Sequence, residues 1–537
     1  MARERQLSPR PAPEPAPRTA PEPAPRTAPE PAPRTAPEPS ARLSRRSLLG
    51  GAAAGAAGLT AVSAGTAPAA TAATAAASRT VDVAIVGGGI AGLTAARDLV
   101  AGGRSVAVLE ARDRVGGRVV NLKLANGGFT EGGGEFIGPT QNRIKALADS
   151  LGVATFTTYN TGNNLLYKDG KRTPYDTSGL LGSVPPVDAA GLANAAIVQS
   201  ELDSMAAQVP VDAPWTAAKA AEWDRQTFES WLNAHAIVPS AKFLLDVACT
   251  SIFSAQPREL SLLYVLYYIA AAGDESNAGT LERLTDTAGG AQESRFVGGS
   301  QQVPIRLAAA LGDRVVLSAP VRSIAKSGGA YVVTADGITV NATRVVVALP
   351  PPLAARITYD PLLPAARDQL TQRLPMGSIG KAIAVYDTPF WRADGLNGQA
   401  VSDSGVVRST FDNSPPDGSY GALMGFIEAD EMRAYDAAGE ADVRAAVLAD
   451  YANYFGDKAK SPTSFVLQRW DNEGFSRGGP VAYAPPGVLT EYGAALREPV
   501  GGIHWAGTET STFWTGYMDG AVRSGERVAK EVLAALG

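Results

Sequence analysis

Residues 80–110, which decide the fold class, read TVDVAIVGGGIAGLTAARDLVAGGRSVAVLE. The run from Thr80 to Val86 is short, apolar and rich in β-branched residues, which predicts a buried parallel strand. A G-x-G-x-x-G motif follows, and residues 90–100 then place apolar side chains at helical spacing. A second apolar run, residues 105–109, ends at an acid, Glu110. This order of strand, glycine turn, helix, strand and acid predicts a dinucleotide-binding β-α-β unit.

Each glycine of the motif has a physical task. Gly87 allows the tight turn, Gly89 lets backbone approach a diphosphate, and Gly92 lets helix and strand pack closely. The N-terminus of the helix would hold the diphosphate, because its free N–H groups and its dipole attract anions. Glu110 would accept hydrogen bonds from the adenosine ribose.

Composition excludes several other kinds of site. The chain has 537 residues, 45% of them hydrophobic, and a net charge of −5, which predicts two to four domains and disfavours nucleic acid as a partner. Cys249 is the single cysteine, and the two histidines, His235 and His504, are far apart in the sequence. Cysteine-built metal sites and a histidine-rich metal centre are excluded, so no metal is predicted. The chemistry then falls to a bound organic cofactor.

The first 77 residues differ in composition from the rest of the chain. Residues 13–39 repeat the octamer PEPAPRTA and begin it again, so residues 1–44 are predicted to be a disordered, proline-rich tail. Residues 45–77 begin with Arg45 and Arg46 and continue with small, uncharged residues, which predicts a twin-arginine export signal. A transmembrane anchor is the alternative, but alanine and glycine give little transfer energy and Pro68 interrupts the run. We therefore expect an exported protein, extracellular or in the cell envelope, with no membrane span in the mature chain.

The segment after Glu110 identifies the kind of dinucleotide. Residues 109–119, LEARDRVGGRV, resemble the flavin-dependent amine oxidase superfamily, in which a Gly-Gly-Arg turn lies beside the diphosphate. The resemblance continues along nearly all of residues 80–537, and the monoamine oxidases are among the members that the chain resembles. Its further motifs are GGEFIGPTQ (residues 133–141), RFVGGSQQV (295–303), VVLSAPV (315–321) and AGTETSTFWTGYMDGAVRSGERVA (506–529).

The resemblance implies FAD as cofactor and an α/β fold. We expect a Rossmann-like FAD-binding domain in three parts, residues 78–150, 295–357 and 486–537. An inserted α+β substrate domain would comprise residues 151–294 and 358–485. A helix that begins near Gly516 would point its N-terminus at the flavin. The residues expected to contact FAD are Gly87, Gly89, Ala91, Gly92, Glu110, Ala111, Arg112, Gly117, Arg118, Gly133, Gly134, Glu135, Val321, Glu509, Tyr517 and Met518.

Lys381 is the sharpest single-residue signal. It lies in GSIGKAIAVY (residues 377–386), which reads as an apolar strand, and a buried lysine there is costly unless it has a partner. The alternative is an edge-strand lysine that points to water. By resemblance, it is the family's lysine that holds a water against flavin N5, and the catalytic set is Lys381, Trp470 and Tyr517.

Aromatic residues are expected to form the substrate side. By resemblance, the substrate cavity is lined by Phe136, Gln292, Phe426, Pro480 and Tyr517. Gly479 and Pro480 replace the family's tethering cysteine and second cage tyrosine. FAD is therefore expected to be non-covalent, with half of the aromatic cage missing. Glu135 is also unusual, and the sequence leaves open whether it is a loop acid or a second ammonium site.

These features predict an enzyme that oxidises an amine to an imine, which water hydrolyses, while O2 is reduced to H2O2. An L-amino-acid oxidase and an amine dehydrogenase with a protein electron acceptor are the alternatives. A non-catalytic flavoprotein would lack Lys381 and the cage aromatics. Amines without an α-carboxylate should be preferred, because no arginine follows Glu135 before Arg143, although Arg408 or Arg477 could still supply one. The sequence is compatible with a homodimer and does not decide the oligomeric state.

Overall fold

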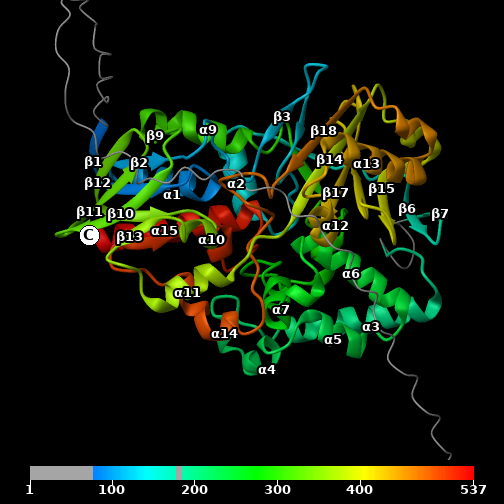
Figure 1. Ribbon diagram of the computed structural model, residues 1–537, viewed down its shortest axis with the longest axis horizontal. Coiled ribbons are helices and arrows are strands. Elements are labelled where there is room, and N and C mark those ends of the chain that lie inside the picture. The colour runs from blue at the N-terminus through cyan, green and yellow to red at the C-terminus, as the bar shows by residue number, and fades with distance from the viewer. Residues whose placement is uncertain (1–76, 177–183) are drawn as a thin grey trace, which may run out of the picture. The chain divides into compact units, whose positions relative to one another are not determined.

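The computed structural model describes residues 77–176 and 184–537 of the chain. The proline-rich repeat and the twin-arginine segment lie outside the described residues, so their roles stay predictions. Two mixed β-sheets organise the described residues, and Figure 1 shows the first sheet at the left and the second at the upper right.

The first sheet has the predicted dinucleotide-binding unit at its centre. Strand β1 (Ala77–Val86) pairs in parallel with β2 and with β12, and β10, β11 and β12 continue the sheet in antiparallel order. In spatial order the other strands are β13 (Thr358–Asp360), β10 (Val321–Ser327), β11 (Ala330–Ala335), β12 (Ile338–Val347), β2 (Val106–Leu109) and β9 (Val315–Val316), with β19 (Ile503–Trp505) paired to β12. Parallel strands at the centre of a sheet are buried on both faces, which explains their continuous apolar runs.

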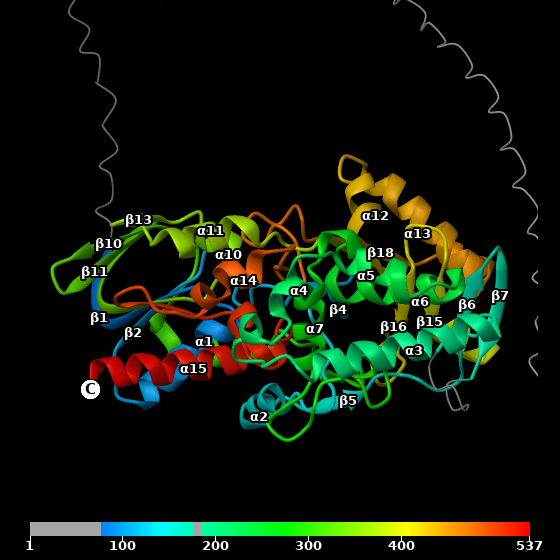
Figure 2. The same cartoon turned by 90° about the horizontal axis from the view of Figure 1, so that it is seen from below.

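Both faces of this sheet carry a hydrophobic core. Val83 and Ile85 pack into one core, with helices α1 (Ile90–Ala101) and α15 (Met518–Leu536), whereas Ala84 and Val86 pack into the other. In Figure 2, α1 and α15 lie on one side of the sheet and α10 and α11 on the opposite side. The remaining helices of this half are α2 (Asn142–Ser150), α9 (Gln302–Leu311), α10 (Pro351–Ala354), α11 (Ala365–Arg373) and α14 (Val488–Tyr492).

The second sheet places Lys381 in an interior strand. Its strand β14 (Ile379–Tyr386) lies between β18 and β17, and all its residues are buried. In spatial order the sheet contains β18 (Ser464–Arg469), β14, β17 (Gly421–Glu428), β16 (Ser409–Asp412), β15 (Leu396–Ser402), β6 (Asn163–Lys168) and β7 (Lys171–Tyr175). Helices α12 (Ala429–Ala434) and α13 (Glu440–Phe455) accompany it, and Tyr451 of α13 donates a hydrogen bond to the Ala382 carbonyl at 2.9 Å. Two smaller pairs are β3 (Asn121–Lys123) with β4 (Phe129–Glu131) and β5 (Thr155–Thr157) with β8 (Ser294–Phe296).

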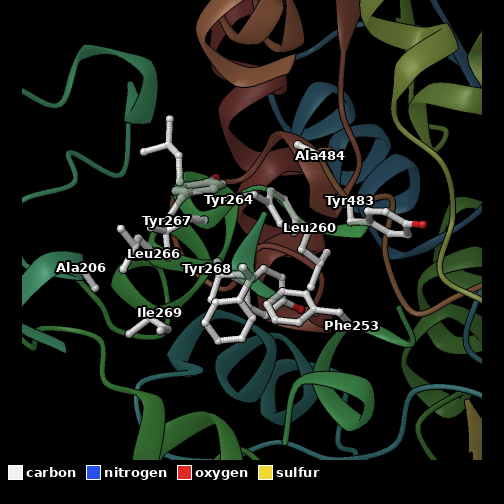
Figure 3. Packing of buried hydrophobic residues seen from close by; sticks show 14 of the residues in the cluster. Ala206, Phe253, Leu260, Tyr264, Leu266, Tyr267, Tyr268, Ile269, Tyr483 and Ala484 are labelled. Carbon is white, nitrogen blue, oxygen red and sulfur yellow. The ribbon is translucent and has the colours of Figure 1, made fainter. Parts of the chain in front are cut away.

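A helical layer between residues 189 and 285 completes the substrate side. Its helices are α3 (Ala189–Ala206), α4 (Ala220–Asp224), α5 (Phe228–His235), α6 (Pro239–Phe253), α7 (Leu262–Ala270) and α8 (Leu281–Thr285). The most apolar of these helices is α7, whose residues 262–269 are all buried. Figure 3 shows Tyr268 beside Phe253, and the centroids of their two rings lie 4.7 Å apart.

Element ends differ from the prediction by a few residues. The last helix begins at Met518 instead of Gly516, because Gly516 has a φ of +86° and Tyr517 is the extended N-cap residue. Within residues 77–176 and 184–537, we find no helix with the length and hydropathy needed to cross a membrane.

Candidate active site

One cavity of about 1260 Å³ connects the glycine turn of the first sheet with β14 and β17 of the second. The predicted site residues that line it are Gly87, Gly89, Ala91, Glu110, Ala111, Arg112, Gly117, Arg118, Gly133, Gly134, Glu135, Phe136, Gln292, Val321, Lys381, Phe426, Trp470, Pro480, Tyr517 and Met518. Gly92 and Glu509 are the predicted site residues that do not line it. Segments that are distant in the sequence therefore meet around one space.

The glycine turn has the geometry of a diphosphate cradle. Gly87 has a φ of +106°, which favours glycine. A Cβ on Gly92 would lie 2.0 Å from the Gly87 carbonyl oxygen, so Gly92 permits the close packing without touching the cavity. A Cβ on Gly89 would meet no atom within 4 Å, so this backbone faces open space at the N-terminus of α1.

Glu110 is fixed at the carboxyl end of β2. Its carboxylate accepts hydrogen bonds from the backbone N–H of Gly88 at 2.7 Å and of Arg112 at 2.9 Å. Each carboxylate oxygen can accept further bonds. The acid is therefore placed beside the glycine turn with capacity left for a ribose hydroxyl.

Glu509 forms an ion pair with Arg118. The Arg118 guanidinium donates to both Glu509 oxygens, at 2.6 and 3.1 Å, and to the Pro480 carbonyl at 2.7 Å. The Ala482 N–H also donates to Glu509, at 3.3 Å. Glu509 thus anchors Arg118, which lines the cavity, and the contact between Glu509 and FAD that the resemblance implies stays a prediction.

Lys381 is buried and paired, so the edge-strand alternative is wrong. Its ammonium donates to the Gly133 carbonyl at 3.0 Å and lies 2.9 Å from Oε1 of Glu135. Arg295 on β8 lies 3.8 Å from Glu135 and forms a 2.7 Å ion pair with Glu131. Burial raises the pKa of Glu135 to about 7, although Lys381 and Arg295 oppose this rise.

Aromatic side chains form the opposite part of the cavity wall. Trp470 donates a hydrogen bond from its indole to the Gly132 carbonyl at 2.8 Å. The Tyr517 ring lies 6.0 Å from Tyr268, and Phe411 lies between Phe136 and Phe426, at 5.3 and 6.0 Å. Gln292 lines the cavity while its amide donates to the Leu284 carbonyl at 3.1 Å.

Sequence reasoning missed several of these residues. Tyr268 and Phe411 line the cavity. Tyr268 belongs to the apolar run of α7, whose pattern resembles ordinary core, whereas Phe411 is the single aromatic residue of the short strand β16 and belongs to none of the motifs. The pairing of Glu135 with Lys381 joins positions 246 residues apart, and only the unusual acid at Glu135 gave a signal.

The family described as flavin containing amine oxidoreductase matches residues 90–533. The chain belongs to this family. It is 43% identical over 457 residues to AofH of Mycobacterium tuberculosis, which is named as a flavin-containing monoamine oxidase; the match covers 85% of this chain and 97% of AofH. It is 39% identical over 461 residues to flavin-containing amine oxidase B of Cavia porcellus, covering 85% and 86% of the two chains.

Solved structures agree with the predicted fold class. A putrescine oxidase bound to putrescine superposes with a TM-score of 0.81 at 35% identity, covering 85% of this chain and all of the other. Cyclohexylamine oxidase from Brevibacterium oxydans gives a TM-score of 0.79 at 34% identity, covering 85% and 99%. The predicted α/β fold, with an FAD-binding sheet and a second mixed sheet, is confirmed.

The protein is a flavin-dependent amine oxidase that converts an amine to an imine and reduces O2. Its residues fit FAD, because the backbone at Gly89 opens into the cavity and Glu110 is held at the end of β2. At the other end of the groove, a Cβ on Gly134 would meet only Met518, at 3.9 Å. The N-terminus of α15 therefore lies beside the glycines expected to face the flavin, where its dipole favours added negative charge.

Proposed function

We propose that this oxidase acts on amines that have no α-carboxylate and carry an apolar or aromatic body. The observation that carries the proposal is the distribution of charge around the cavity. The arginines that line it are Arg112, Arg118, Arg322, Arg356 and Arg477. Each of these arginines lies in or beside a segment that lines the part of the cavity where the diphosphate and adenosine of FAD are expected.

Of the arginines considered as carboxylate ligands, Arg477 lines the cavity directly after Ser476, which accepts a hydrogen bond from Arg112 at 2.9 Å, so it lies at the dinucleotide end. Arg143 and Arg408 have other surroundings. Arg143 lies within 4 Å of Glu275 and Glu526, and Arg408 donates to the Ser402 carbonyl at 3.3 Å. Neither Arg143 nor Arg408 lines the cavity. A bidentate arginine is the usual ligand for a buried carboxylate, so an amino acid would lack this partner among the described residues next to Phe426 and Tyr517.

The reaction removes two electrons and two protons from the amine. When bound, FAD accepts a hydride equivalent from the substrate C–H bond and passes two electrons to O2, which gives H2O2. Water then hydrolyses the imine to an aldehyde or ketone and ammonia or a smaller amine. The aromatic rings of Tyr268, Tyr517 and Phe426 enclose the apolar body and exclude water, while their negative faces attract the amine.

The test compares kcat/KM for phenethylamine and for L-phenylalanine, which differ by the α-carboxylate. We expect the amine to have the higher value. Higher values for the amino acids across several side chains would contradict the proposal and favour the L-amino-acid oxidase.

We further propose that FAD is held without a covalent bond. Cys249, the only cysteine of the chain, is buried in α6 and does not line the cavity. Gly479 lines the cavity at the position where the resemblance expects a tethering cysteine. Acid precipitation should leave the flavin in the supernatant, and yellow colour in the washed pellet would refute non-covalent binding.

Export by the twin-arginine route is proposed from the sequence of residues 45–77 alone. A variant with Arg45→Lys and Arg46→Lys should remain in the cytoplasm while the parent chain is exported. Equal export of the two chains would contradict this route.

A further inference from the structure

Glu135 belongs to a buried cluster of four charges. Lys381 lies on β14, Arg295 on β8 and Glu131 on β4, and the side chains of all four residues are at most 5% exposed. These are the titratable and charged groups that face Glu135 from the elements packed around it. Two positive and two negative charges make the cluster neutral when all are ionised.

The cluster holds the backbone that faces the flavin site. Lys381 donates to the Gly133 carbonyl at 3.0 Å, and Ser300 donates to the Gly134 carbonyl at 2.6 Å. Glu131 fixes Ser300 by accepting its backbone N–H at 2.8 Å. Glu135 follows these glycines directly and its carboxylate lies 2.9 Å from the Lys381 ammonium.

We propose that Glu135 is a positioning residue that holds Lys381 in a neutralised ion pair against Gly133 and thereby sets the charge presented to the flavin and to O2. This inference rests on the proposed function. Reduction of O2 places negative charge beside the flavin, and an uncompensated ammonium in a water-poor site would favour it. Glu135 restrains that effect while it keeps the ammonium in place.

Protonation of Glu135 should have the same electrostatic effect as its removal. Burial raises the pKa of Glu135 to about 7, which lies within the pH range of the experiment described below. Below that pH the cluster carries an excess positive charge, and above it the cluster is neutral. Wild-type reoxidation should therefore be faster at low pH than at high pH.

The experiment uses the purified holoenzyme, reduced with a stoichiometric amount of dithionite so that no amine is needed, and follows reoxidation by O2 from about pH 6 to 8.5. Glu135→Gln keeps the size and an acceptor but removes the charge. At high pH, the flavin of this variant should be reoxidised at least about three times as fast as that of wild type. The rate should also no longer depend on pH. Its bound FAD should also have a higher midpoint potential, which is measured at equilibrium without turnover.

Two further variants separate this role from a general structural one. In a Lys381→Met background, Glu135→Gln should change reoxidation by less than about twofold, because Glu135 acts through Lys381. Glu428→Gln is the matched control, since Glu428 is 3% exposed, lies on the neighbouring strand β17 and forms no ion pair with Lys381. This control should keep the wild-type pH profile and potential.

A wild-type profile that is flat over this range overturns the proposal without any variant. An unchanged midpoint potential in Glu135→Gln, or an undiminished effect in the Lys381→Met background, also overturns it. Because dithionite supplies the electrons, a protein that does not oxidise amines would refute the proposed function and would still test the role of Glu135.

Discussion

Alanine at Gly89 should weaken FAD binding more than it weakens folding. Alanine at Gly92 should mainly destabilise the fold. At Gly89 the backbone, with φ −77° and ψ 177°, is one that alanine adopts, and the added Cβ meets no protein atom within 4 Å. Alanine is a poor N-cap residue, so the substitution should destabilise the fold by about 0.5–1 kcal/mol. At Gly92 the added Cβ lies 2.0 Å from the Gly87 carbonyl oxygen. Relieving that overlap requires α1 to move from the sheet and should cost about 1–3 kcal/mol or more.

FAD affinity should show the reverse order, with Gly89→Ala the more harmful of the two substitutions. The Gly89 methyl occupies the space where backbone would approach the diphosphate. Loss of one charge-assisted hydrogen bond costs roughly 1.5–3 kcal/mol, which weakens binding by about 10- to 150-fold. Urea unfolding gives the stability of each variant, and flavin fluorescence during FAD titration gives the affinity. Wild-type affinity in Gly89→Ala, or equal destabilisation by the two substitutions, would refute this account of the turn.

Three further substitutions test the interior charges. Lys381→Met should keep FAD absorbance but slow reoxidation by O2, as stopped-flow mixing would show; a normal rate in the folded variant would make the lysine structural. Arg118→Met leaves the Glu509 carboxylate buried without its cation, so urea unfolding should show a loss of roughly 3–5 kcal/mol, and a loss below 1 kcal/mol would contradict it. Burial raises the pKa of Glu428 to about 8, so the folded state binds this proton more tightly than the unfolded state, and the contribution of Glu428 to wild-type stability falls as pH rises from 4.5 to 8. The free energy of unfolding of Glu428→Gln, relative to that of wild type, should therefore rise by about 1.4 kcal/mol per pH unit in that range. A difference that stays constant between pH 5 and 8 would contradict the raised pKa of Glu428.

The sequence predicted the β-α-β unit at the centre of the first sheet because its signals are local. The strand from Thr80 to Val86, the glycine turn and Glu110 are adjacent, and each position has a steric or hydrogen-bonding reason. Burial of Lys381 was also predictable, because an apolar strand pattern surrounds it. The partner of Lys381, Glu135, was not predictable, because the two residues come together only through the tertiary packing of β14 against the segment that follows β4.

The least predictable residues are those whose type suits both a core and a site. Tyr268 lies in the most apolar helix, and only the packing of α7 beside Tyr517 places it at the cavity. Glu509 lies within a motif that the resemblance covers, yet its carboxylate holds Arg118, which the motif alone does not reveal. Local patterns therefore predict the elements, whereas tertiary packing decides which side chains share a cavity.

Oxidation of an amine by the flavin, followed by transfer of two electrons to O2, can be observed in two stopped-flow steps. The holoenzyme is first mixed with phenethylamine without oxygen, and the flavin absorbance should bleach. Mixing with aerated buffer should then restore the absorbance and release one H2O2 for each flavin oxidised. Flavin that stays oxidised with phenethylamine and with a panel of other amines would contradict amine oxidation, and bleached flavin that O2 fails to restore would contradict the oxidase.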